Sequence, residues 1–123
     1  MKQPVIDIVD DDEAVRSATF LLLSSYGWRA RAFASAEQFL ETLKLGSAPD
    51  CLLLDLNMPG MNGAELLEKL AVKQSALPVI VITGMRDAQL IARARKAGAR
   101  DVLDKPFHEK ELKASVDRVL AAA

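Results

Sequence analysis

Five polar side chains of this sequence stand where short apolar runs of the chain end. Asp10 and Asp11 follow the first run, Asp55 the third, Thr83 the fourth and Lys105 the fifth. Three carboxylates close together in a partly buried site repel one another, so they need a cation to remain ionised together. An all-oxygen donor set without His or Cys selects a hard ion, usually Mg²⁺ when water and phosphate complete its shell. These residues therefore predict a divalent-cation site.

The same side chains suit phosphoryl transfer. An aspartate is a nucleophile, the cation and a lysine supply positive charge, and a threonine hydroxyl donates to the oxygens of a phosphoryl group. The product of such a site is an aspartyl phosphate. Taken singly, each residue has an ordinary explanation, such as helix capping for residues 10–13 or a turn at Thr83 and Gly84. Their joint placement at strand ends favours the functional interpretation.

The elements that must position these residues follow from the alternation of short apolar runs with longer stretches of helical spacing. This alternation indicates parallel strands joined by crossover helices. The predicted strands are residues 5–9, 28–33, 51–54, 79–82 and 101–103. The predicted helices begin near residues 12, 35, 62, 87 and 108.

The order of the strands follows from the strand at 28–33. In it Arg29 and Arg31 alternate with apolar neighbours, which suits an edge strand, and it alone ends without a charged group. The other four strands must be neighbours if their polar ends converge. With right-handed crossovers the order is 2-1-3-4-5, and the site lies where the first and third strands diverge. The predicted fold class is α/β: one doubly wound (βα)5 flavodoxin-like domain over residues 1–123.

The composition sets the size and class of the protein. The chain has 123 residues, with 16 Lys and Arg against 17 Asp and Glu and a net charge of -1. This length fits one domain, and the charge balance lacks the basic excess of a chain that binds nucleic acid by itself. The apolar runs are too short for a bilayer, and the single cysteine cannot form an internal disulfide. We expect a cytoplasmic protein without membrane contact or direct nucleic-acid binding.

Four stretches of the sequence closely resemble the receiver domain of two-component response regulators, and the resemblance covers essentially the whole chain. The stretches are Ile8 to Asp12, Leu54 to Gly63, Val79 to Gly84, and Lys96 to Ala99 together with Lys105-Pro106-Phe107. These motifs are most similar to those of regulators of the FixJ kind, in which a receiver precedes a helix-turn-helix DNA-binding domain. The resemblance implies that DNA is reached only if such a domain follows.

The resemblance also implies roles for the site residues. Asp55 would be the phosphoacceptor, Thr83 the switch hydroxyl and Lys105 the phosphoryl-binding lysine. The implied Mg²⁺ ligands are the carboxylates of Asp11 and Asp55, the backbone carbonyl of Asn57, and Asp10 through a bound water. In the family the Lys-Pro peptide is typically cis, so the same is expected of Lys105 and Pro106.

The function implied by the resemblance is a phosphorylation-controlled switch rather than an enzyme. A sensor histidine kinase would donate the phosphoryl group, and the face formed by the fourth helix, fifth strand and fifth helix would carry the output. We expect a phosphorylation-dependent homodimer there, in which Arg93, Arg95 and Lys96 contact Asp101 or Asp104 of another molecule. One position departs from the family pattern.

That position is Val102, where the family usually carries an aromatic residue that moves with the threonine. Valine is small and stiff, so the active and inactive states should differ less in energy.

Three alternatives stand beside this interpretation. A Mg²⁺-dependent phosphatase or phosphotransferase with an aspartate nucleophile would carry a second acid two residues after it, where this chain has Asn57. A flavodoxin-like electron carrier would need a phosphate loop rich in Ser, Thr and Gly, and aspartates would repel its nucleotide. The third alternative is a degenerate receiver that signals without phosphate, but this chain has every residue that the phosphorylation site requires.

Outside the site, Cys51 is predicted to be a core thiol and His108 a solvated or capping residue.

Overall fold

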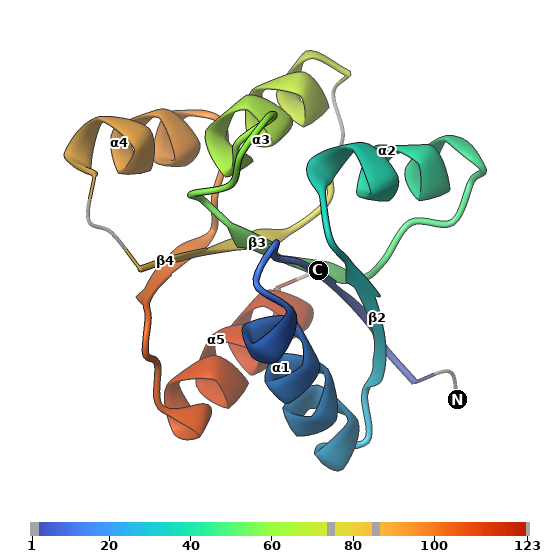
Figure 1. Cartoon of the computed structure of the whole chain (residues 1–123). Helices are drawn as coiled ribbons and strands as arrows, with labels where there is room; N and C mark the ends of the chain where they lie inside the picture. Colours follow the sequence, from blue (N-terminus) through green and yellow to red (C-terminus); the bar gives the residue numbers. More distant parts are fainter. Residues whose placement is uncertain (1–2, 74–75, 85–86, 123) are drawn as a thin grey trace.

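The computed structural model describes residues 3–73, 76–84 and 87–122. Strands and helices alternate along the whole chain (Figure 1). The strands are β1 (Val5–Val9), β2 (Arg29–Phe33), β3 (Cys51–Asp55), β4 (Val79–Thr83) and β5 (Asp101–Asp104). The helices are α1 (Glu13–Ser25), α2 (Ala36–Lys44), α3 (Gly63–Val72), α4 (Ala88–Lys96) and α5 (Glu109–Ala121). Over the described residues, no helix has the length and apolar character that a membrane crossing requires.

The strands of the described chain form one five-stranded parallel sheet in the order β2-β1-β3-β4-β5. This order confirms the predicted topology. The boundaries differ slightly, because β2 begins at Arg29 and β3, β4 and β5 each run one residue further than predicted. Asp55, Thr83 and Asp104 are therefore the last residues of their strands, and the backbone ladder itself positions them.

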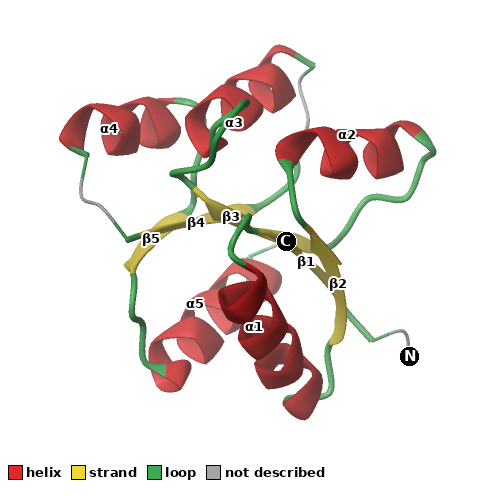
Figure 2. Ribbon diagram, viewed as in Figure 1, coloured by secondary structure: helices red, strands yellow, loops and turns green. Residues whose placement is uncertain are grey.

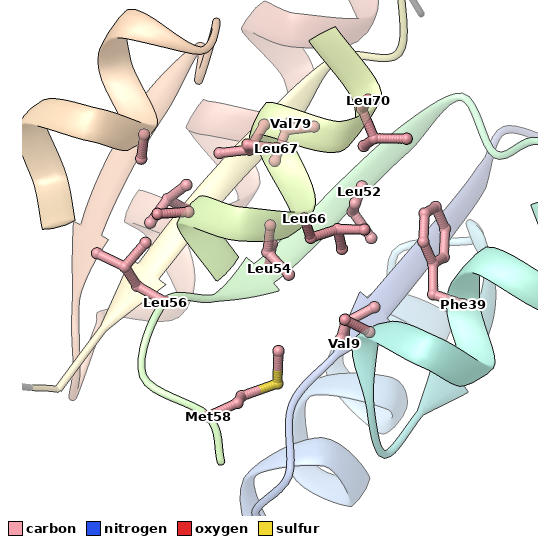
Figure 3. Close-up of a cluster of buried hydrophobic side chains, with 14 of the residues drawn as sticks. Val9, Phe39, Leu52, Leu54, Leu56, Met58, Leu66, Leu67, Leu70 and Val79 are labelled. Atoms are coloured by element: carbon pink, nitrogen blue, oxygen red, sulfur yellow. The ribbon is translucent and has the colours of Figure 1, made fainter. Parts of the chain in front are cut away.

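The helices cover both faces of the sheet. Figure 2 shows α2, α3 and α4 above the strands and α1 and α5 below them. Each face has its own apolar core. The upper core joins Leu52 and Leu54 of β3 to Phe39 of α2 and Leu66 and Leu70 of α3 (Figure 3). Below the sheet, the alternate strand residues pack against α1 and α5. Since β3 and β4 are covered on both sides, every residue in them is buried, which explains their continuous apolar runs.

Side-chain caps place the helix starts close to the strand ends. The Asn62 side chain accepts from the Glu65 backbone N–H at 2.9 Å, and the Glu65 carboxylate accepts from the Asn62 N–H at 3.2 Å, a capping box. The Ser35 hydroxyl accepts from the Gln38 N–H at the start of α2. Both caps lie at predicted helix starts, near residues 35 and 62. They fix where the loops after β2 and β3 end.

Candidate functional site

Three carboxylates meet at the carboxyl ends of β1 and β3. The two strands are neighbours, so Asp10 and Asp11 after β1 lie beside Asp55 at the end of β3. One carboxylate oxygen from each lies within 4.8 Å of the others. Asp10 and Asp55 are each only 4% exposed, whereas Asp11 is exposed. All the donors are hard oxygen atoms, so this cluster fits a divalent cation such as Mg²⁺.

The surroundings of Asp55 disfavour its ionised form. Burial raises its pKa to about 6, and the nearby Asp10 charge acts in the same direction. The Asn57 backbone N–H donates to Asp55 Oδ1 at 3.1 Å and acts against this shift, as does Lys105. A second positive charge near this carboxylate would therefore favour its ionised form.

Lys105 supplies the fixed positive charge of the site. Its Nζ lies 2.9 Å from Asp10 Oδ2 and 3.5 Å from Asp55 Oδ2. Burial lowers the pKa of this lysine, but the hydrogen bonds and charges of Asp10 and Asp55 more than offset it, so the net shift is upward. The peptide between Lys105 and Pro106 is cis, as expected. The Lys105 ammonium is thus charged and aimed into the acidic cluster.

Thr83, the last residue of β4, is 1% exposed. Its hydroxyl donates to the side-chain Oδ1 of Asn57 at 2.9 Å. Its backbone carbonyl accepts from the Lys105 N–H at 2.8 Å, which ties the end of β4 to the chain after β5. The structure thus brings together all the site residues that the sequence analysis named.

Three supporting contacts were missed by sequence reasoning. The Arg16 guanidinium donates from Nη1 to the Asp10 backbone carbonyl at 2.7 Å, and the Asp12 N–H donates to Asp10 Oδ1 at 2.9 Å. Arg16 and Asp10 are six residues apart, so the spacing of side chains on a helix did not signal this contact. The third missed contact is the hydrogen bond that the Asn57 side chain accepts from Thr83, because the sequence analysis considered only the carbonyl of Asn57. The first two contacts hold the acidic loop after β1, and the third ties the loop after β3 to the end of β4.

Residues outside the site behave mostly as expected. Cys51 is fully buried, and burial raises the pKa of its thiol to about 12, so it is an inert core group. His108 is exposed and precedes α5. Arg93 forms an ion pair with Glu68 at 2.7 Å, and Asp101 accepts from Ser115 and Arg118. Both Arg93 and Asp101, which we expected at an intermolecular contact, already have partners within the chain.

Comparison with known proteins gives one consistent result. The family model of the response regulator receiver domain matches residues 6–117. The chain is 37% identical over 118 residues to the transcriptional regulatory protein FixJ of Bradyrhizobium diazoefficiens, covering 96% of this chain and 57% of that protein. It is 40% identical over 122 residues to the response regulator protein TmoT of Ectopseudomonas mendocina, covering 99% and 55%. The chain thus spans a little over half the length of these relatives.

Solved structures agree with these sequence relatives. The crystal structure of FixJ-N superposes with a TM-score of 0.90 at 35% identity, covering 100% of this chain and 98% of that one. A CheY-like receiver domain protein from Methanospirillum hungatei superposes with a TM-score of 0.92 at 27% identity, covering 98% and 96%.

Proposed function

This chain belongs to the response regulator receiver domain family, and from that premise we propose that it is a cytoplasmic, phosphorylation-controlled switch of a two-component phosphorelay. It takes a phosphoryl group from a phosphohistidine of a sensor histidine kinase onto Asp55, with Mg²⁺ as cofactor. One observation carries this proposal: the buried Asp55 carboxylate lies opposite Lys105 and beside the two acids that follow β1. The receiver domain corresponds to residues 1–123, and its own chemistry is limited to gaining and losing this phosphoryl group.

The transfer step is a displacement at phosphorus. A carboxylate oxygen of Asp55 forms a new P–O bond while the P–N bond to the donor imidazole breaks, and the bonding pair stays on the imidazole nitrogen, which takes up a proton. Lys105 lies 3.5 Å from Asp55 Oδ2 and is placed to bind an oxygen of the incoming group. Thr83 supplies the neutral donor for another oxygen.

The metal site uses the residues implied by the family. The carboxylates of Asp11 and Asp55 and the backbone carbonyl of Asn57 would hold Mg²⁺, with Asp10 acting through a bound water. When bound, the ion neutralises charge that develops on the phosphoryl oxygens. The burial of Asp10 and Asp55 supports this assignment, since two buried carboxylates with one lysine between them leave negative charge uncompensated.

The output face is formed by α4, β5 and α5. Thr83 lies at the end of β4, and β4 pairs directly with β5. A displacement of Thr83 would therefore act on β5, the neighbouring strand, which belongs to this face. Val102 of β5 is half-buried and packs against the upper core, in the place of the usual aromatic residue. A phosphorylation-dependent homodimer would use the exposed Arg95 and Lys96 of α4. DNA would be bound only if a helix-turn-helix domain followed this one.

The test is intact-mass measurement after treatment with a small phosphodonor, with and without Mg²⁺. The wild-type chain should gain one phosphoryl group only with Mg²⁺ or Mn²⁺ present, and Asp55→Asn should gain none. Asp50→Asn is the matched control, because Asp50 lies at the other end of the same strand, where it accepts from the Val5 N–H. An undiminished mass gain in Asp55→Asn would refute the assignment.

A further inference from the structure

A hydrogen bond joins the side chains of Thr83 and Asn57. The proposed metal binding and phosphoryl transfer do not use this hydrogen bond. Thr83 Oγ1 donates to Asn57 Oδ1 at 2.9 Å, and the threonine is buried while the asparagine is half-buried. The backbone N–H of the same asparagine donates to Asp55 Oδ1 at 3.1 Å. The loop that carries the phosphoacceptor therefore also holds the side chain of the residue that ends β4.

A threonine hydroxyl has one hydrogen to donate. While Asn57 Oδ1 accepts that hydrogen, no phosphoryl oxygen on Asp55 can accept it. We propose that Asn57 is a positioning residue that holds Thr83 in its unphosphorylated arrangement, so that switching requires the hydroxyl to exchange the amide oxygen for a phosphoryl oxygen. This inference rests on the proposed function, since it assigns the event that phosphorylation must drive.

The exchange has a direction because the two acceptors differ in strength. A phosphoryl oxygen is anionic, and hydrogen bonds to ionised acceptors are stronger than hydrogen bonds to neutral ones. Phosphorylation therefore draws Thr83 away from Asn57. In the unphosphorylated protein no phosphoryl oxygen competes, so the Thr83 hydroxyl donates to Asn57 Oδ1. Asn57 thereby keeps Thr83 in its resting arrangement. The side chain acts separately from the backbone carbonyl, so its removal leaves the proposed metal ligand in place.

The test uses the unphosphorylated chain and a double-mutant cycle. Three-bond couplings to the Thr83 methyl group report the χ1 rotamer of that side chain by NMR. In the wild type one rotamer should dominate. In Asn57→Ala the population of this rotamer relative to the other χ1 rotamers should fall about fivefold. This factor corresponds to the net free energy of a typical hydrogen bond. The amide shifts of residues 87–104 should move in the same variant.

The second arm of the cycle uses Thr83→Val, which keeps the shape of the side chain but lacks the hydroxyl. In that background Asn57→Ala should leave the amide shifts of residues 87–104 unchanged, because the hydrogen bond between these two side chains is already absent. The proposal is overturned if Asn57→Ala leaves the Thr83 couplings at their wild-type values, or if it moves the amide shifts equally in both backgrounds. Phosphoryl uptake is measured separately by intact mass. Failure of uptake in the wild type refutes the proposed function, whereas the couplings test the role of Asn57 alone.

Discussion

Asp7 places a carboxylate in the middle of β1, where its neighbours are all apolar. The group is fully buried, and Arg31 of the neighbouring β2 binds it in bidentate fashion, with Nε–Oδ1 and Nη2–Oδ2 distances of 2.7 and 2.8 Å. The guanidinium also donates to the hydroxyl and the carbonyl of Ser47 in the loop before β3. One arginine thus joins the edge strand to the strand inside it and to a loop.

This pair predicts a destabilising effect of Arg31→Met. Removing the arginine leaves a buried carboxylate without its partner, which costs about 3 kcal/mol of unfolding free energy at neutral pH. Arg29→Met is the control, because Arg29 is exposed on the same strand, and it should change stability by less than about 0.5 kcal/mol. Urea denaturation measures both. A variant Asp7→Leu/Arg31→Met should recover most of the loss, and failure to recover would show that the arginine acts through its contacts with Ser47.

The same pair predicts the pH dependence of that loss. Burial raises the pKa of Asp7 above its ordinary value of 3.8, although Arg31 acts against the shift. The folded state therefore binds more protons than the unfolded state between these two pKa values, and this group lowers stability as pH rises across that window. In Arg31→Met the pKa of Asp7 rises further and the window widens. The cost of Arg31→Met should be larger at pH 7 than at pH 4, and an equal cost at both values would contradict the account.

At the scale of an element, α3 begins against the end of β3, the strand that carries the proposed phosphoacceptor Asp55. A Cβ at Gly63 would lie 2.6 Å from the Asp55 carbonyl oxygen and 2.9 Å from the Leu56 Cα. The Gly63 N–H also donates to the Leu56 carbonyl at 3.1 Å. Only a glycine permits the helix to approach the strand so closely, and this approach sets the position of the loop between them.

Gly63→Ala is therefore expected to destabilise the protein and to disturb the site together. Backbone atoms must move to admit the methyl group, at a cost of about 1–3 kcal/mol in thermal or urea unfolding. Because the displaced atoms belong to Asp55 and Leu56, the rate of phosphoryl uptake should also fall. Lys69→Ala, on the exposed side of the same helix, should change neither quantity. If Gly63→Ala lowered stability but left phosphoryl uptake normal, the close contact of α3 with β3 would not control the geometry of the site.

At the scale of the whole molecule, the fold concentrates negative charge at one edge of its sheet. The net charge of the chain is only -1, yet three carboxylates converge at the ends of β1 and β3, and Lys105 forms ion pairs with two of them, Asp10 and Asp55. Folding must bring these like charges together, and Coulomb repulsion opposes it. A bound cation would remove this cost.

Mg²⁺ should consequently stabilise the folded chain by linkage. A concentration a hundred times the dissociation constant adds about 2.7 kcal/mol and raises the melting temperature. Asp11→Asn removes an exposed carboxylate of the proposed metal site and should lose most of this rise in melting temperature. Sodium chloride at the same ionic strength is the control, because screening alone acts on surface charges in general. No upward shift with Mg²⁺, together with an unchanged melt in Asp11→Asn, would argue against the metal site.

The strand order and the place of the site were predictable from the sequence for a physical reason. Strands buried on both faces must be apolar throughout, so β3 and β4 differ from the edge strand β2 in composition, and right-handed crossovers then leave one arrangement. Polar residues at the carboxyl ends of neighbouring parallel strands must converge. Asp10, Asp55, Thr83 and Lys105 were found in this way without knowledge of any side-chain position.

The partners of individual side chains were decided only by the tertiary structure. Arg31 and Asp7 are 24 residues apart, and Thr83 and Asn57 are 26 residues apart. Whether such groups meet depends on the register between strands, on the path of a loop and on the rotamer of each side chain. None of these leaves a periodic signal in the sequence, since apolar periodicity reports which face of an element is buried and not which atom lies opposite. The sequence by itself determined where the charges gather, and the packed fold determined which of them pair.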